Sequence, residues 1–273
     1  LVAFGTSIPE LFVNARAYAV GAQDLALGNA VGSNIVNFGL TLALAALAAP
    51  LLIRMRLLSP MLVTLVVATL AVILFGLDGV ISQLEGIVLL LAFVAMLVFM
   101  LARSSRESAE VRESVAAYAD TRSVLWLNVL RFVVAVALLY FGAKFVVSSA
   151  PVIGASWGLS PLLVGLLPVA IGTALPEVAA AIAAARRGQG DMVAGHVIGS
   201  SLFNLLVVVG GMAALRPLPL PASFVRLELP AAIVFALMLY PMLRGDLRIS
   251  KGEGGVLFIA FLGWVVLELA LLM

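Results

Sequence analysis

The sequence predicts an all-α protein that crosses a membrane many times and is built from two inverted repeats. Three observations lead to this fold class. Hydrophobic residues make up 64% of the 273 residues and charged residues only 11%, too few to cover the surface of a soluble domain. Apolar segments of about 20 residues, the length that spans hydrocarbon, follow one another along the chain. Two polar motifs then recur at a single offset of 167 residues.

Nine membrane spans are expected, joined by short connections. They are residues 1–20, 25–49, 57–76, 80–102, 124–147, 158–186, 191–214, 224–243 and 253–272. The polar segment 103–123 is expected to be a solvated linker between two halves, 1–102 and 124–273. The chain opens inside a hydrophobic span, and residues 124–169 have no counterpart before Leu1 at the repeat offset. The first half is therefore expected to lack its first span, and the whole plan to be five plus five spans.

The distribution of Lys and Arg predicts the orientation of the spans. Cytoplasmic loops of membrane proteins carry the excess of these residues. Counted over alternate connections, eleven lie on one side and three on the other. The linker 103–123 belongs to the richer side, so it is expected in the cytoplasm and the C-terminus outside. A bacterial inner membrane is the expected location.

The overall composition excludes several classes of function. The formal net charge of +2 is too small to indicate nucleic-acid binding, and the absence of cysteine excludes thiolate chemistry. A single histidine excludes a multi-histidine metal site within one chain. No nucleotide-binding loop is present. The sequence therefore predicts neither an enzyme nor a resident cofactor, and any transport would be driven by ion gradients.

The internal repeat is carried by two motif pairs. "AFGTSIPEL" at 3–11 matches "AIGTALPEV" at 170–178, and "GNAVGSNIVN" at 28–37 matches "GHVIGSSLFN" at 195–204. Chance similarity of apolar segments would preserve leucines and not Gly, Thr, Pro, Glu, Ser and Asn, so the pairs indicate duplication. Five spans separate equivalent points, and an odd number inverts the second copy. Inverted repeats are typical of secondary transporters, with the site at the repeat interface near the midplane.

The first motif is expected to break its helix near the midplane. Pro9 has no N–H to bond the carbonyl of Gly5, and its ring kinks the helix there. Pro176 repeats the arrangement. Released carbonyls, among them those of Thr6 and Thr173, are tolerated at membrane depth only where they line a protein-buried or watery cavity. The motif therefore predicts backbone oxygens that face a polar site.

Glu10 and Glu177 follow the two prolines directly. A charged residue at the midplane costs at least about 2.5–3.5 kcal/mol, and two would repel unless a cation or protons lay between them. Two bidentate carboxylates and two carbonyls supply roughly six oxygens, and Ca²⁺ takes about six to eight. Such a set suits Ca²⁺, several Na⁺ or protons, and does not suit Zn²⁺ or copper. The alternative is a buried pair with a purely structural role.

The second motif adds hydroxyl and amide oxygens. Ser33 and Asn37 lie four residues apart on one helical face, and Ser200 and Asn204 repeat this spacing. These faces are candidates for weaker sites that bind monovalent cations. The alternative is small-residue helix packing with interhelical hydrogen bonds.

With these residues the sequence resembles the cation/calcium antiporter superfamily, best known for sodium/calcium exchangers, in its compact prokaryotic type. The resemblance implies the inverted-repeat antiporter fold and Ca²⁺ export in exchange for Na⁺ by alternating access. It implies Glu10 and Glu177 as Ca²⁺ ligands, with backbone oxygens from Thr6 and Thr173. The side chains that it implies for Na⁺ or for the central site are Ser7, Ser33, Asn37, Ser200 and Asn204.

The second repeat departs from the family pattern at four positions. Ala174 stands where the first repeat has Ser7, so one hydroxyl ligand is lost. Asn204 is neutral where some members carry Asp. His196 and Ser201 replace the usual asparagines. His196 is expected to be a packing or interface residue, and the alternative is that it makes transport sensitive to pH. The hydroxyl ligand lost at Ala174 bears on how many Na⁺ are exchanged, or on whether Na⁺ is used at all.

Three other functions stay open at this point. Protons could replace Na⁺ as the counter-ion, because protonation of Glu10 and Glu177 also neutralises the site and Ala174 favours it. A cation channel or an inactive fragment are the less favoured alternatives. The expected partners are Ca²⁺, Na⁺ or H⁺ and the lipid bilayer, with no nucleic acid and no prediction of oligomeric state.

Overall fold

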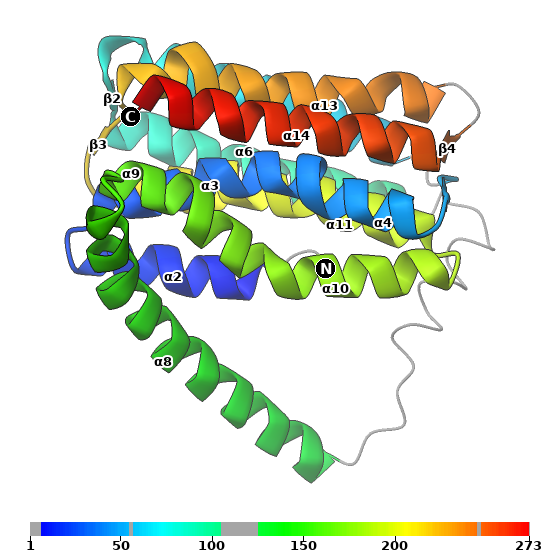
Figure 1. Ribbon diagram of the computed structural model, residues 1–273, viewed down its shortest axis with the longest axis horizontal. Coiled ribbons are helices and arrows are strands. Elements are labelled where there is room, and N and C mark those ends of the chain that lie inside the picture. Colours follow the sequence, from blue (N-terminus) through cyan, green and yellow to red (C-terminus); the bar gives the residue numbers. More distant parts are fainter. Residues whose placement is uncertain (1–6, 55–56, 105–124, 245–246, 273) are drawn as a thin grey trace.

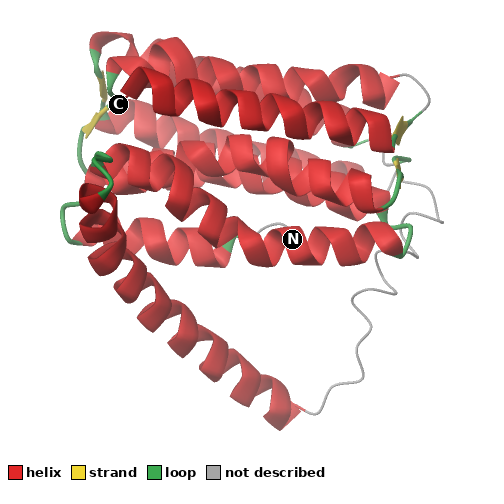
Figure 2. Ribbon diagram, viewed as in Figure 1, coloured by secondary structure: helices red, strands yellow, loops and turns green. Residues whose placement is uncertain are grey.

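The computed structural model describes residues 7–54, 57–104, 125–244 and 247–272, which form a bundle of long helices (Figure 1; Figure 2). Within these ranges, eight helical segments are long and apolar enough to cross a membrane. The shorter helix α2 (Ile8–Ala19) is the described part of the first expected span. The expected all-α membrane protein is confirmed.

The elements follow one another along the chain with few gaps. The α-helices are α2 (Ile8–Ala19), α3 (Gln23–Val36), α4 (Ala43–Ala48), α5 (Leu58–Phe75), α6 (Gln83–Ser104), α8 (Leu125–Ser156), α9 (Pro161–Val164), α10 (Ala170–Arg186), α11 (Gly190–Phe203), α12 (Gly210–Leu215), α13 (Leu229–Arg244) and α14 (Lys251–Leu272). The π-helical turns are η1 (Asn37–Leu42), η3 (Gly165–Val169), η4 (Asn204–Val209) and η5 (Phe224–Glu228), and η2 (Gly76–Asp78) is a 3₁₀ turn. The strands are β1 (Leu51–Leu52), β2 (Val80–Ile81), β3 (Leu218–Pro219) and β4 (Arg248–Ile249).

Two of the π-helical turns occupy equivalent places in the repeats. η1 begins at Asn37 and η4 begins at Asn204, which is the repeat offset. Each turn continues the helix of the second motif, so that α3–η1–α4 and α11–η4–α12 each form one span. π-Helical turns are rare and are frequent at functional sites. The duplication therefore kept a local backbone irregularity as well as residue types.

The short strands show that the repeats are inverted. β1 pairs antiparallel with β4, and β2 pairs antiparallel with β3. β3 follows β1 at the repeat offset of 167 residues, yet β2–β3 and β4 lie at opposite ends of the bundle (Figure 1). Equivalent parts of the two repeats thus lie at opposite ends of the bundle.

The boundary between the fifth and sixth expected spans needs a correction. Helix α8 continues to Ser156 and carries Pro151 inside it, whereas the sequence predicted an end at residue 147. The next span begins at Pro161, with the Ser160 hydroxyl accepting a hydrogen bond from the N–H of Leu163 at 3.3 Å. The small residues around Pro151 resemble a connection, but a proline is tolerated in a membrane helix.

The backbone near Pro176 also differs from the expected break. Pro176 lies inside α10, which continues as an α-helix from Ala170 to Arg186. The π-helical turn η3 lies just before α10, and the span slopes down from α9 before it runs on as the straight part of α10 (Figure 1). Because proline has no N–H, the carbonyl freed within α10 is that of Gly172. The first copy of this backbone, residues 1–6, lies outside the described residues, as does the carbonyl of Thr6.

The spans of the second motif are the most buried. The most apolar stretch of α3–η1–α4 is 83% buried and that of α11–η4–α12 is 78% buried, against 6% for α8, which diverges from the bundle in Figure 1. Gly28 and Gly32 of α3 let this helix meet the backbone of α9 and η3, because a Cβ at either position would overlap Leu162 or Leu166. Close contact through small residues is typical of membrane helices.

Candidate ion-binding site

Polar side chains from both repeats gather in the core of the bundle. They come from α2 and its equivalent α10, and from α3–η1 and its equivalent α11–η4. Seven of the predicted site residues are at most 3% exposed: Ser7, Glu10, Ser33, Asn37, Glu177, Ser200 and Asn204. Thr173 is half-buried, and Thr6 lies outside the described residues.

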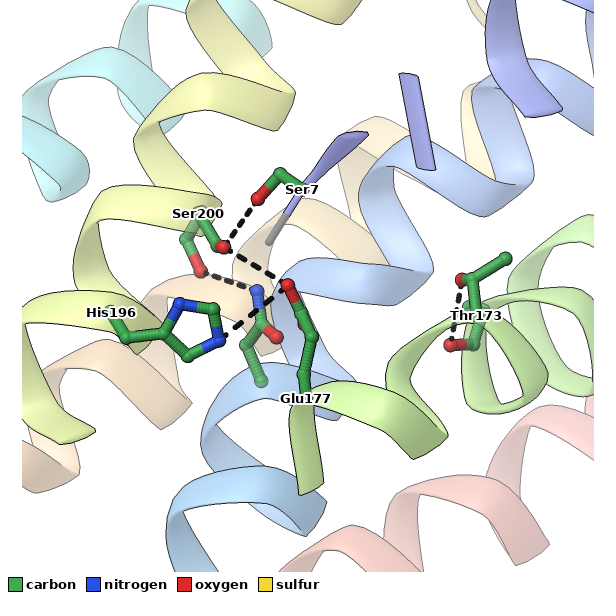
Figure 3. Close-up of polar contacts among 8 residues, drawn as sticks. Ser7, Thr173, Glu177, His196 and Ser200 are labelled. Carbon is green, nitrogen blue, oxygen red and sulfur yellow. Dashed lines mark hydrogen bonds and ion pairs between the residues drawn. The ribbon is translucent and has the colours of Figure 1, made fainter. Parts of the chain in front are cut away.

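A chain of hydrogen bonds joins the two repeats at this place (Figure 3). The hydroxyl oxygens of Ser7 and Ser200 lie 2.5 Å apart. The Ser200 hydroxyl is also 3.3 Å from Oε1 of Glu177 and can donate to it. Ser7 precedes α2, whereas the other two residues lie on α11 and α10. The structure thus brings a hydroxyl of the first repeat next to a hydroxyl and a carboxylate of the second.

The π-helical turn of the first repeat contributes a second link. The side-chain amide of Asn37 donates to the hydroxyl of Ser201 at 3.3 Å. Among the described residues, the side-chain oxygens of Asn37, Asn204 and Ser33 have no hydrogen-bond donor although they are buried. Buried oxygens are normally paired with a donor, water or an ion. These three are available to ligate a cation.

Glu10 and Glu177 form the charged part of the site. Both are buried, and they are close enough to repel one another when both are ionised. No lysine or arginine of the described part is paired with either carboxylate. Both carboxylate oxygens of Glu10 lack a hydrogen-bond partner in the same part of the chain. Two unneutralised carboxylates in a membrane core are costly, and a bound cation or protons offset this cost.

The side chain of Thr173 belongs to a neighbouring polar network. Its hydroxyl approaches Glu10 but is bonded elsewhere, 3.2 Å from the carbonyl of Ala170 and 3.4 Å from Oδ1 of Asn29. The amide of Asn29 in turn donates to Oδ1 of Asn14 at 2.8 Å. Asn14 and Asn29 were not among the predicted site residues. Their signal in the sequence was an asparagine one turn after Glu10 and another at the start of the second motif.

His196 lies in the site, which corrects the expectation of a packing or interface histidine. It is 8% exposed, and its Nε2 is 3.5 Å from Oε1 of Glu177 (Figure 3). Its equivalent at the repeat offset is Asn29, which bonds Asn14 and Thr173 instead. The sequence showed that the residue differs from its equivalent, but the direction of the side chain follows from the packing of α11 on α10.

The available donors set limits on how a metal ion could be held. Within the described ranges, no three carboxylate or imidazole groups converge in a ready metal site. An ion held there would therefore need further donors, such as hydroxyl, amide and backbone oxygens, beside the carboxylates. Ala174, fully buried on α10, adds no hydroxyl where the first repeat has Ser7.

Comparison with known proteins gives the family. The family model of the sodium/calcium exchanger protein matches residues 1–102 and 127–270. The chain belongs to the sodium/calcium exchanger family. Two relatives of this family member are 33% identical to it: the putative antiporter CaxA of Alkalimonas amylolytica and the inner membrane protein YrbG of Escherichia coli. The alignments cover 97% and 98% of this chain, and 84% of each relative.

A solved structure of the exchanger family has the same fold. The sodium-calcium exchanger NCX_Mj, soaked with Na⁺ and Sr²⁺, superposes with a TM-score of 0.72 at 27% identity. The superposition covers 97% of this chain and 83% of that one. Family and fold together make this exchanger-family chain an integral membrane transporter of the cation/Ca²⁺ antiport class, as its sequence predicted.

Proposed function

We propose that the chain exports Ca²⁺ in exchange for Na⁺ through alternating access to one buried site that contains Glu10 and Glu177. One observation carries the proposal. The two carboxylates, unpaired with any lysine or arginine of the described part, lie among buried oxygens of both repeats. Ca²⁺ is a hard cation that takes oxygen ligands, and its charge neutralises both carboxylates.

The hydrogen-bonded chain of the site supports exchange of different ions at one place. A cation that takes the Ser200 hydroxyl as ligand competes with the contacts of this hydroxyl to Ser7 and Glu177. Na⁺ carries half the charge of Ca²⁺, so several Na⁺ are needed to neutralise the same carboxylates. The further oxygens of Ser33, Asn37 and Asn204 supply places for them. Thr6 and Thr173 contribute backbone oxygens in this proposal.

The inverted repeats support alternating access. Each repeat presents its copy of the motifs to the same core from the opposite face of the membrane. If the two repeats exchange conformations, the site changes from one side to the other while its ligands stay together. In this proposal the protein lies in a bacterial inner membrane. The linker 103–123, between the halves 1–102 and 124–273, is then on the cytoplasmic side.

Exchange of Ca²⁺ for protons is the second candidate, favoured by Ala174. This residue is fully buried on α10 and brings no hydroxyl to the second repeat. A site with fewer oxygens binds Na⁺ more weakly, whereas protonation of Glu10 and Glu177 needs no further ligand.

Flux into vesicles separates the two candidates. The purified protein is reconstituted, and uptake of radiolabelled Ca²⁺ is measured under an outward Na⁺ gradient at equal pH, and then under a pH gradient without Na⁺. Uptake driven by Na⁺ alone is expected. Uptake that responds only to the pH gradient would identify the proton exchanger and reject the sodium version.

A further inference from the structure

The position of His196 gives the site a nitrogen donor that the first repeat does not have. Nε2 of His196 lies 3.5 Å from Oε1 of Glu177, and Oε1 lies 3.3 Å from the hydroxyl of Ser200 (Figure 3). All three side chains are buried. Imidazole and carboxylate thus lie next to one another in the core.

The distance fits two ligands of one ion. An ion–nitrogen bond of about 2.1 Å and an ion–oxygen bond of about 2.4 Å, at an angle of about 100°, put the two donor atoms about 3.5 Å apart. The observed contact between Nε2 and Oε1 has this length. Ligation requires the neutral imidazole, whose Nε2 then presents its lone pair to the space beside Glu177.

The difference between the repeats shows that this arrangement is not imposed by the fold. Asn29, the equivalent of His196, bonds Asn14 and Thr173 and makes no hydrogen bond to Glu10. An asparagine at position 196 would satisfy the repeat pattern with an oxygen donor. The histidine replaces that hard donor by a softer one next to the carboxylate.

We propose that His196 is a ligand of the transported ion and widens the range of the site to divalent first-row transition metals, with Mn²⁺ as the clearest probe. Carboxylate and hydroxyl oxygens suit Ca²⁺ and Mn²⁺ alike, whereas imidazole suits transition metals and contributes little for Ca²⁺. Mn²⁺ stands at the weak end of the affinity order, so it can also be released on the other side. The inference rests on the proposed ion site at Glu177.

The direct test uses the fact that His196 is the only histidine of the sequence. The protein is purified with a tag that contains no histidine, loaded with Mn²⁺ and examined by pulsed electron paramagnetic resonance. A coupling of Mn²⁺ to an imidazole nitrogen is expected, and it changes when the histidine is labelled with the heavier nitrogen isotope. The same protein with His196→Asn is expected to show no such coupling. Mn²⁺ bound without the nitrogen coupling, or no Mn²⁺ bound, would overturn the proposal.

A competition assay gives the functional measure. In wild-type vesicles Mn²⁺ and Sr²⁺ are both expected to inhibit Ca²⁺ uptake. His196→Asn is expected to raise the half-inhibiting Mn²⁺ concentration by at least about tenfold, the usual effect of removing a group that supports a metal site, and to leave inhibition by Sr²⁺ unchanged. Equal shifts for both ions would assign His196 a structural role only.

The two proposals fail in different ways. Without ion-coupled Ca²⁺ uptake in the wild type, the proposed exchange is wrong, but the nitrogen coupling still reports whether His196 binds the metal. If the His196→Asn variant does not fold, the isotope-labelled wild-type protein alone still shows whether Mn²⁺ is coupled to the imidazole nitrogen.

Discussion

The two repeats of this molecule share their scaffold and differ in their chemistry. Both place a glutamate after a proline, both begin a π-helical turn at an asparagine, and both carry two short strands that pair with strands of the other repeat. The side chains around the glutamates are not shared. Glu177 contacts Ser200 and His196, whereas Glu10 has no hydrogen-bond partner among the described residues.

The comparison separates the backbone geometry, which the two inverted copies share, from the side chains, which differ between them. The π-helical geometry that carries the backbone through the core is the same in both copies, as the proposed alternating access would require of two repeats that exchange conformations. The ligands would not need to be equal, because in that proposal one ion is held by both repeats at once. Ser7 against Ala174, Asn29 against His196 and Asn34 against Ser201 are polar positions of the motifs where the copies have diverged.

The largest effect is expected at the shared glutamates. Glu10→Gln and Glu177→Gln each remove one of the two charges that neutralise Ca²⁺, so each is expected to abolish Ca²⁺ uptake in vesicles. The unequal surroundings of the two residues make no difference to this outcome. Glu253→Gln on α14, where Glu253 accepts bonds from Ser250 at the start of the helix, is the control and is expected to transport normally. Uptake at the wild-type rate in either variant at position 10 or 177 contradicts the central site.

The equivalent serines of the second motif are expected to respond unequally. Ser200→Ala removes both the contact with Ser7 and the bond to Glu177, so we expect about a tenfold to hundredfold loss of apparent Ca²⁺ affinity, as for groups that orient ligands. Ser33→Ala removes a hydroxyl that has no partner in the described part, and a smaller loss is expected. Concentration curves for Ca²⁺ uptake measure both. Equal losses would mean that the hydrogen-bonded chain has no part in binding.

Contact between the repeats can be tested at glycine. A Cβ at Gly165 would overlap the backbone of α3 at Leu25 and Asn29, whereas Gly263 on α14 has open space around it. Gly165→Ala is therefore expected to destabilise the protein by about 1–3 kcal/mol, the usual cost of overpacking, and Gly263→Ala is not. Thermal unfolding in detergent compares the two. A normal melting temperature for the Gly165 variant would show that the contact between α3 and η3 is looser than described.

The smallest effect is expected from making the repeats more alike. Ala174→Ser restores the hydroxyl that the first repeat has in Ser7. If Na⁺ is the counter-ion, the Na⁺ concentration for half-maximal exchange is expected to fall about twofold to tenfold, the equilibrium effect of one hydrogen-bond-sized contact. A variant with the same Na⁺ dependence as the wild type shows that position 174 does not contribute to Na⁺ binding.

The sequence was sufficient for the fold, and the polar residues that it singled out are buried in the core, although their role as ion ligands stays a prediction. Composition predicted the membrane spans, and the offset of 167 residues predicted the inversion, because both depend on chemistry that is visible residue by residue. The π-helical turns at Asn37 and Asn204 were not predictable, since a π-turn differs from an α-turn in hydrogen bonding and not in composition. That Pro176 lies within one α-helix, preceded by the π-helical turn η3, was not predictable for the same reason.

Contacts between distant residues account for the rest. That Ser7 meets Ser200, and that His196 points to Glu177, depends on the packing of helices far apart in the chain. Periodicity places a residue on a face of its own helix but does not say which face of another helix it meets. Only a known arrangement of the four central helices supplies that information.

One measurement tests the central claim most directly. Vesicles containing the wild-type protein or Glu177→Gln are given an outward Na⁺ gradient at equal pH on both sides, and uptake of radiolabelled Ca²⁺ is followed. We expect the wild type to accumulate Ca²⁺ and the variant to stay at the level of empty vesicles. Equal accumulation by the two proteins would contradict a transport site built on Glu177.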